Sequence, residues 1–553
     1  MLDLRLFRAS LIPFVAMLAI VAFSVHPLPA PLTSGIPPAG FNGARAFNVL
    51  EHLEARFPRR RTGSPADRAL GSLIASRLAG DGYAVRTAGG AVLATQPGPG
   101  RGSLVLLADR SGAGAAALSG TAALLELARD LAARGDLRPL TLVSTDGTTV
   151  PPLRGQVAAA IVLGDLAGTG ARHPFEIPFS NDGSAAPLAL QQTLTHWLPG
   201  NSGRPGVLDQ LAEFALPFSV TAQAPLLDAG IPAVLAQQSG ESGPAADEPV
   251  SQARLAAFGR AIASTLAALE RAPAQARVTR DLTLSGDRLG GWSIRALVAA
   301  LLFATALPAL DVFARARRRR VPLLRSLAWL LLWAAPVGAS LLFSKLLGQL
   351  GALGTLPASP ALLEPGASGV LVLAATLAFF AVACLVRVKL IKWPSREPDD
   401  GLGAAVAVVC VGTVLALALW IANPYTAALL ALPLVLWLPL LTAERERERH
   451  PLAVLAWLAL SLVPLGGVLA VEALSLGLGP LRFSWSWFAV LASGQLGLFG
   501  FLAVSLAGAL VLTTAILLVR SNRLALRDEL RLTTRGPITY AGPGSLGGTP
   551  SAR

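Results

Sequence analysis

Long apolar runs in the second half of the chain constrain its fold more than any other feature. Beyond residue 290, each apolar segment is similar in length to a transmembrane helix, which needs about 20 residues to cross a bilayer. A further apolar run, 11–25, follows Arg5 and Arg8, so about eight spans are expected in all. The other predicted spans are 292–313, 322–344, 368–388, 402–422, 425–442, 451–473 and 494–519.

The first apolar run has two interpretations, a cleaved signal peptide or a retained anchor. The proline-rich stretch HPLPAPL follows the run, and it contains no clear cleavage site with small residues. We therefore favour an uncleaved anchor. Near the other end of the chain, residues 485–493 (WSWFAVLAS) are rich in tryptophan, which is typical of a segment at the membrane interface.

The charged turns predict the orientation of the chain. The net charge of +13 is concentrated in turns that alternate spans would place on one side of the membrane, and the turns on the other side are nearly uncharged. The positive-inside rule assigns the charged side, and both termini, to the cytoplasm. The basic turns predict contacts with membrane lipids, and no nucleic-acid partner is expected. The charged turns are 315–320, 387–396, 444–450 and 520–531.

Between the first span and the others the chain has the pattern of a globular α/β domain. Residues 103–108, 140–145 and 158–164 are short apolar runs typical of strands buried on both faces. Between the first two lies 121–135, whose leucines recur at helical spacing, and strand, helix and strand in this order predict a parallel βαβ unit. Another buried strand is expected within 226–237.

These patterns divide the chain into four parts: an anchor (1–30), an extracytoplasmic domain (31–285), a bundle of about seven transmembrane helices (286–535) and a disordered cytoplasmic tail (536–553). Both cysteines, Cys384 and Cys410, fall in predicted spans, so no disulfide is expected in the outer domain. Arginine far outnumbers lysine, which with the excess of Ala, Gly and Pro suggests a bacterial plasma-membrane protein.

Three segments of the outer region resemble the di-zinc aminopeptidases of metallopeptidase family 28. Residues 58–85 (PRRRTGSPADRALGSLIASRLAGDGYAV) are similar to the family's Arg, Gly-Ser-Pro and helix leading to Gly-Tyr-x-Val. Residues 119–132 resemble the helix after the family's bridging aspartate, and residues 224–234 resemble the stretch after its last histidine ligand. The resemblance covers most of 45–270 and implies a mixed, largely parallel sheet with helices on both faces.

The resemblance also implies which residues stand at the family's di-zinc site. That site uses two histidines, three carboxylates and a further glutamate as general base. Only one of the five ligands remains here, and the base is lost, so no zinc cofactor and no catalytic residue are expected. The degenerate positions are Asp109 for the first histidine, Ala116 for the bridging aspartate, Thr148 and Thr149 for the Glu-Glu pair, Asp165 for the next aspartate, which is kept, and Gln223 for the final histidine.

Other candidate sites in the outer domain have weaker support in the sequence. Four carboxylates at the same sheet edge would suit a hard cation such as calcium, although solvated loop carboxylates are the simpler interpretation. Neither His173 nor His196 falls at a predicted sheet end, and no G-x-S-x-G elbow supports a serine hydrolase. The four carboxylates are Asp109, Asp146, Asp165 and Asp182.

The order of anchor, outer domain and bundle resembles multi-span membrane aminopeptidases and the peptidase-like subunit of the GPI transamidase, whose site is degenerate. The sequence therefore predicts a non-catalytic binding or scaffold protein for a peptide, a lipid-linked substrate or a partner protein. The alternatives are an active membrane hydrolase with a divergent site and a transporter component. In the bundle, Asp311, Lys345 and Glu472 are expected to reach the membrane interface, and Asn423 is expected to bond between helices.

Overall fold

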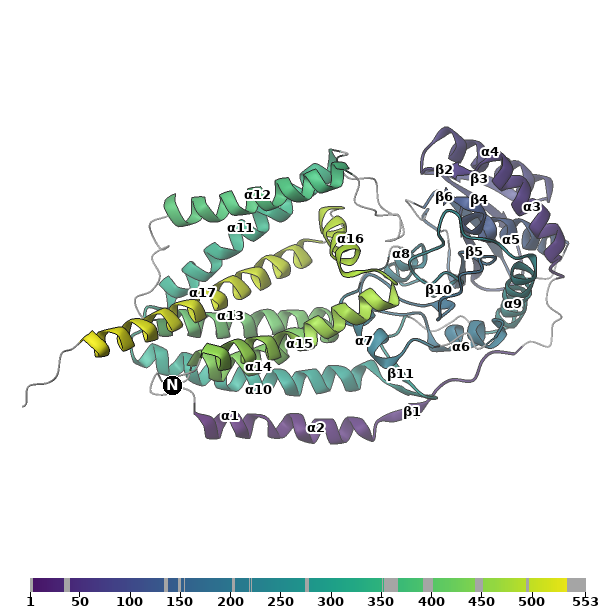
Figure 1. The fold of residues 1–553 in the computed structure, drawn as a ribbon. Helices are drawn as coiled ribbons and strands as arrows, with labels where there is room; N and C mark the ends of the chain where they lie inside the picture. Colours follow the sequence, from purple (N-terminus) through teal and green to yellow (C-terminus); the bar gives the residue numbers. More distant parts are fainter. Residues whose placement is uncertain are drawn as a thin grey trace, which may run out of the picture.

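The protein has two halves, an α/β domain and a bundle of long helices (Figure 1). The bundle contains the N-terminal helices and the helices described after residue 290, and the α/β domain lies at one end of it. The structure is a computed structural model. It describes residues 3–33, 40–133, 138–147, 151–153, 155–200, 204–217, 219, 221–273, 278–350, 352, 367–390, 401–442, 451–493 and 497–534.

A mixed seven-stranded sheet forms the centre of the α/β domain, in the order β3-β4-β7-β5-β8-β10-β9. The four strands β7, β5, β8 and β10 are mutually parallel, and β3, β4 and β9 are antiparallel to their neighbours. The fold class expected from the sequence is therefore confirmed. The strands are β3 (Ala84–Ala88), β4 (Ala91–Gln96), β5 (Ser103–Asp109), β7 (Leu140–Thr145), β8 (Val157–Leu163), β9 (Glu176–Ile177) and β10 (Ala233–Ala236), and a two-stranded pair is formed by β2 (Arg59–Arg60) and β6 (Gly112–Ala113).

The buried apolar runs account for the parallel centre of the sheet. Strands β5 and β8 are covered along most of their length, as expected where helices pack over a parallel sheet. Helices surround the sheet, and α5 packs against β5, β7 and β8. The helices of this half are α3 (Gly43–Arg56), α4 (Pro65–Gly80), α5 (Gly114–Ala132), α6 (Leu188–Trp197), α7 (Val207–Ala215), α8 (Gln223–Asp228) and α9 (Gln252–Glu270).

Helix α5 starts at Gly114, earlier than the expected 121–135. The reason is the run of alanines at its start, because alanine has the highest helix propensity. Gly120 lies in this helix where it meets the sheet, and a Cβ there would overlap the carbonyl oxygens of Leu163 and Gly164. Glycine at this position therefore allows the close approach of α5 to the end of β8.

Among the described residues, six helices are long and apolar enough to cross a membrane, or seven if α15 and α16 form one bent span. These two helices meet at an angle of 99°. The eighth expected span corresponds to α14, whose apolar part, Pro424–Leu438, is shorter than the others. The long helices are α10 (Gly291–Arg318), α11 (Leu323–Gln349), α12 (Ala367–Leu390), α13 (Gly401–Ala422), α14 (Pro424–Thr442), α15 (Pro451–Ser475), α16 (Pro480–Ser493) and α17 (Leu498–Thr534). The expected tail, 536–553, lies outside the described residues.

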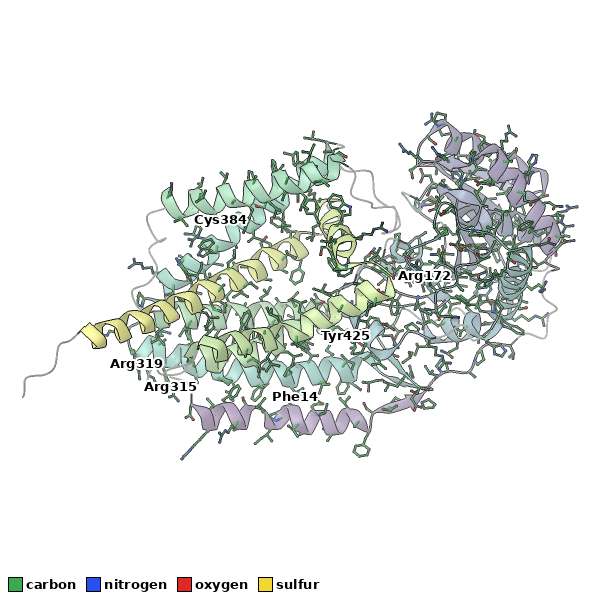
Figure 2. All side chains as sticks on the ribbon, in the orientation of Figure 1. Phe14, Arg172, Arg315, Arg319, Cys384 and Tyr425 are labelled. Atoms are coloured by element: carbon green, nitrogen blue, oxygen red, sulfur yellow. The ribbon has the colours of Figure 1, made fainter. Side chains whose placement is uncertain are left out.

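The N-terminal segment is packed into the bundle. Helices α1 (Leu4–Ser10) and α2 (Ile12–Ala22) lie along α10, and Phe14 packs against a cluster that includes Leu301 (Figure 2). The Ser24 hydroxyl donates to Ser293 Oγ at 2.9 Å. The chain then forms β1 (Val25–Pro27), which pairs with β12 (Asp287–Leu289), and β12 pairs with β11 (Leu282–Leu284). The first segment is thus tied to the residues that lead into α10.

Two bundle residues lie in surroundings that the sequence did not predict. Glu472 was expected to reach the membrane interface, but it is 0% exposed on α15. Asn423 was expected to bond between helices, and its side-chain amide does so at 2.7 Å, but the accepting carbonyl is that of Phe214 in α7, a helix of the α/β domain. Both residues lie where the bundle meets α7, so tertiary contacts between the halves explain both differences.

Candidate functional site

Parallel strands bring the expected site residues to one edge of the sheet. Strand β5 ends at Asp109, which is paired with Thr145 at the end of β7, and Ala108 is paired with Leu163 at the end of β8. Asp109, Asp146 and Asp165 therefore follow neighbouring strands at their carboxyl ends. In α/β sheets this edge is where ligands bind.

Asp109 is held by the loop that follows it. Its Oδ1 accepts a hydrogen bond from the Ser111 amide at 2.8 Å, and its Oδ2 accepts one from the Ser111 hydroxyl at 3.0 Å. Burial raises the pKa of the Asp109 carboxyl, against the two Ser111 bonds, which lower it. Gly147 lies against this carboxylate, since a Cβ on it would come within 2.9 Å of Oδ2. The next expected site residues, Thr148 and Thr149, lie outside the described residues.

Asp165 and Ala116 are joined through Ser119. The Ser119 hydroxyl lies 2.6 Å from the Ala116 carbonyl oxygen and 3.3 Å from Asp165 Oδ1. The same carboxylate oxygen accepts bonds from the amides of Ala167, at 3.1 Å, and Gly168, at 2.8 Å. Burial raises the pKa of Asp165, and these bonds lower it. The retained aspartate thus acts as the cap of its own loop, and the buried residue across from it is an alanine.

Gln223 is fully buried at the start of α8. Its amide nitrogen donates to the carbonyl of Phe179 at 3.2 Å and to Ser219 Oγ at 3.3 Å. In the part of the chain that the structure describes, no hydrogen bond or ion pair joins Gln223 to Asp109 or Asp165. The structure therefore brings Ala116 and Asp165 together, places Asp109 on the same edge, and gives Gln223 separate partners.

The alternative of a four-carboxylate cation site is not supported by the geometry. Among the described residues, no group of three or more His, Cys, Asp or Glu side chains could hold a metal ion. Asp182 instead accepts bonds from the Ser180 hydroxyl and the Ser184 amide, both within its own turn. His173 packs on Phe175 with a ring-centroid distance of 4.2 Å.

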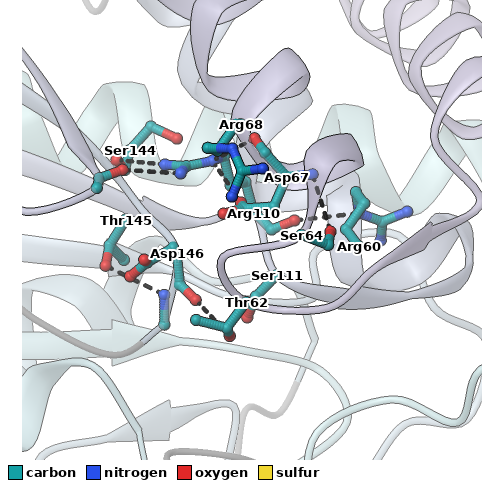
Figure 3. A network of polar contacts seen from close by, with 12 residues as sticks. Arg60, Thr62, Ser64, Asp67, Arg68, Arg110, Ser111, Ser144, Thr145 and Asp146 are labelled. Carbon is teal, nitrogen blue, oxygen red and sulfur yellow. Dashed lines mark hydrogen bonds and ion pairs between the residues drawn. The ribbon is translucent and has the colours of Figure 1, made fainter.

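A buried ion pair beside the sheet edge was not predicted from the sequence (Figure 3). Arg110, which follows β5, pairs with Asp67 of α4 at 2.8 Å, and each side chain is 2% exposed. The same guanidinium donates to the carbonyl oxygens of Ser144, at 3.0 Å, and Gly90, at 2.8 Å. One side chain therefore links α4 with β7 and the β3–β4 turn. The available signal was a second charged residue, two positions after the apolar run 103–108.

The arginine of the 58–85 segment has a structural role of the same kind. Arg60 is 0% exposed, and it donates to the carbonyl oxygens of Arg110 and Gly114, both at 3.0 Å. Burial lowers the pKa of this guanidinium, and Glu54 raises it. Arg60 thus fastens the segment to the loop between β5 and α5, where the candidate site begins.

Three solved structures are similar to part of the chain. The chain is similar to a glutaminyl cyclase from Porphyromonas gingivalis, with 18% identity and a TM-score of 0.29 over 41% of this chain and 98% of that chain. A glutaminyl cyclase from an Acidobacteriales bacterium is 16% identical, with a TM-score of 0.32 over 44% of this chain and 99% of that chain. A putative zinc-dependent exopeptidase from Bacteroides vulgatus is 15% identical, with a TM-score of 0.29 over 42% of this chain and 98% of that chain. No family model and no curated protein matches the chain.

The donor set at the sheet edge does not fit a pair of zinc ions. Zinc in proteins is bound by histidine, cysteine and carboxylate side chains, usually four to each ion. Among the described residues, the edge offers the carboxylates of Asp109, Asp146 and Asp165 together with the methyl group of Ala116, and Asp109 and Asp165 are already hydrogen-bonded. Among the described residues, no group of three or more His, Cys, Asp or Glu side chains at this edge could hold a metal ion, and the carboxylates present can accept hydrogen bonds from a ligand.

Proposed function

We propose that the protein is a membrane-anchored, non-catalytic relative of the di-zinc aminopeptidases, with an outer domain that binds a peptide, a lipid-linked substrate or a partner protein. The observation that carries the proposal is the pair of Ala116 and Asp165. A bridging aspartate would need to extend from the position that Ala116 fills with a buried methyl group. The remaining aspartate caps its own loop through Ala167 and Gly168.

The loss of the general base supports the same proposal. Hydrolysis at such a site needs a carboxylate that takes a proton from water, and a carboxylate suits this because its pKa can be tuned towards neutrality. In the sequence resemblance, Thr148 and Thr149 stand where the family has two glutamates. A threonine hydroxyl does not ionise near neutral pH. Binding is therefore the activity that the remaining side chains support best.

We propose an orientation in which the α/β domain lies outside the plasma membrane of a bacterium and both termini lie in the cytoplasm. The chain would then cross the membrane eight times, with α14 as a short span. The support is the basic end of α10, since Arg315 and Arg319 lie at the end of the bundle farthest from the α/β domain (Figure 2). The resemblance to the GPI transamidase subunit concerns architecture and implies no GPI role.

The test is an activity measurement on the full-length protein in detergent. The substrates are aminoacyl reporters and peptides with an N-terminal glutamine, because the similar structures include a putative exopeptidase and glutaminyl cyclases. Turnover should not exceed that of an Asp165→Asn variant, with or without added zinc. Zinc-dependent turnover that disappears in this variant would instead establish the second candidate, an active hydrolase with a divergent site.

A further inference from the structure

The outer domain is fastened to the bundle through the C-terminal end of α7. The last carbonyl groups of a helix have no partner within the helix. Here Phe214 O accepts a bond from the Asn423 side chain at 2.7 Å, and Ala215 O accepts one from the Thr426 hydroxyl at 2.7 Å. The ring of Tyr425 stacks on Phe214 with centroids 4.9 Å apart. The turn between α13 and α14 thus caps a helix of the outer domain, and we call this contact region the joint (Figure 2).

Three glutamates, the buried Glu213 and Glu472 and the half-buried Glu241, meet at the joint. Glu213 belongs to α7, Glu241 follows β10, and Glu472 belongs to α15, which packs against α7. Glu472 is 0% exposed, and neither of its carboxylate oxygens has a hydrogen-bond partner. Glu213 is 6% exposed, and one of its oxygens also lacks a partner. A bundle helix therefore directs an unpartnered carboxyl group towards two carboxyl groups of the outer domain.

No basic side chain neutralises these glutamates within the described part of the chain. The charged groups around them are Asp209, one turn before Glu213 on α7, and Arg172. Arg172 is bonded to Ser242 Oγ at 2.9 Å and to the Leu476 carbonyl at 3.4 Å, and it forms no ion pair with the three glutamates. Asp209 accepts a bond from the Gly206 amide and adds a further negative charge. Three ionised carboxylates in this region would repel one another strongly.

The proximity of two of the glutamates favours a proton between them. The charge of Glu241 acts on Glu213, and one oxygen of each carboxyl group has no hydrogen-bond partner. Two ionised carboxylates are both acceptors only, so a hydrogen bond between them can form only when one is protonated. The direction of the pKa shift agrees with a proton at this position, since burial and the charges of Glu241 and Glu472 raise the pKa of Glu213 well above its ordinary value. Burial also raises the pKa of Glu241, while its bonds with Ser219 and Glu213 lower it.

We propose that Glu213, Glu241 and Glu472 form a proton-binding site that clamps the outer domain to helix α15 when it is occupied and loosens the joint when it is empty. The ligand is the proton itself, because among the described residues no group of three or more His, Cys, Asp or Glu side chains could hold a metal ion. The site couples the acidity of the outer compartment to the mobility of the outer domain. It is independent of whether that domain is catalytic.

The sign of the pH dependence follows from the direction of the shifts. The contacts of the joint hold the glutamate pKa values above the ordinary value of 4.5, so the closed joint binds protons more tightly than the open one. Closure is therefore most favourable below the ordinary pKa and is weakened as the pH rises through the raised values. For one linked proton, the equilibrium between closed and open joint changes about tenfold per pH unit in that window.

The test is amide hydrogen exchange of the full-length protein in lipid nanodiscs between acidic and mildly alkaline pH. The reporter amides are those of α7 and of residues 472–478, after correction for the intrinsic pH dependence of exchange. The wild-type protein should lose protection there by about tenfold per pH unit. Glutamine has the shape of a protonated glutamate, so Glu472→Gln and Glu213→Gln should fold and keep the protection at alkaline pH.

The matched control is Glu51→Gln, because Glu51 is exposed on α3, outside the joint. This variant should show the wild-type profile. If the wild-type protein and Glu472→Gln give the same profile, or if protection rises with pH, the proton-binding site is wrong. Failure of both glutamine variants to fold would also overturn it, since removing unpaired buried charge is expected to stabilise the joint.

Discussion

The buried pair of Arg110 and Asp67 gives the sharpest stability prediction. Methionine in place of Arg110 fills much of the same space with an apolar side chain. It removes the ion pair at 2.8 Å and the donors to Ser144 O and Gly90 O. Asp67, at 2% exposure, is then left without its counter-charge. Breaking a buried pair from one side costs about 3–5 kcal/mol, and we expect a loss in this range.

The partner substitution and the double variant isolate the pair. Asp67→Asn removes the charge but keeps the shape, and Arg110 retains its carbonyl acceptors, so the expected loss is about 1–3 kcal/mol. The double variant should be more stable than the sum of the two losses predicts, by up to about 3 kcal/mol, because the interaction is removed only once. The matched control is Arg68→Met on the same helix, an exposed side chain whose replacement should change stability by less than about 0.5 kcal/mol.

The assay is pulse proteolysis of the full-length protein in detergent across a urea series, which measures the unfolded fraction of the outer domain. A loss below about 1 kcal/mol for Arg110→Met would refute the structural role of this side chain. Additive losses in the double variant would show that Arg110 and Asp67 act independently, which contradicts the geometry of Figure 3.

Three further predictions concern pH, the lost site and the N-terminus. Burial raises the pKa of Glu176 from 4.5 to about 7, so the outer domain should lose about 3 kcal/mol of stability between these pH values, and Glu176→Gln should remove that dependence in urea unfolding. Restoring the family's site residues together should destabilise the zinc-free protein, and zinc should recover part of the loss; an absent zinc effect would refute the residue assignment. Because α2 and β1 are packed into the fold, the intact mass should be 57.0 kDa, and a mass lacking residues 1–30 would show cleavage. The restoring substitutions are Asp109→His, Ala116→Asp, Thr148→Glu, Thr149→Glu and Gln223→His.

Local patterns in the sequence were sufficient for the centre of the fold. Strands β5 and β7 and the helix between them follow from apolar runs and helical spacing, because both signals are contained within a few residues. The mixed edges of the sheet were implied only by the family resemblance. Strand β9 has two residues, and a segment of that length has no periodicity from which a strand can be predicted.

The polar contacts were beyond sequence reasoning for a different reason. Asp67 and Arg110 lie 43 positions apart, and only the packing of α4 on the sheet brings them together. The three glutamates at the joint come from α7, from the segment after β10 and from α15. Glu472 was assigned to the membrane interface because it lies at the end of a predicted span, and no local signal shows that α7 covers it. The sequence was more informative about Ala116, because its assignment to the position of the bridging aspartate depends only on the resemblance of the short neighbouring segment 119–132.

The metal content of the full-length protein tests the central claim most directly. The protein should be purified without chelators from cells grown with zinc, and the bound metal measured per chain by elemental mass spectrometry. Because Ala116 offers no ligand and Asp165 is engaged by its own loop, we predict no stoichiometric zinc. One or two tightly bound zinc ions per chain would contradict the account and establish a working metal site in the outer domain.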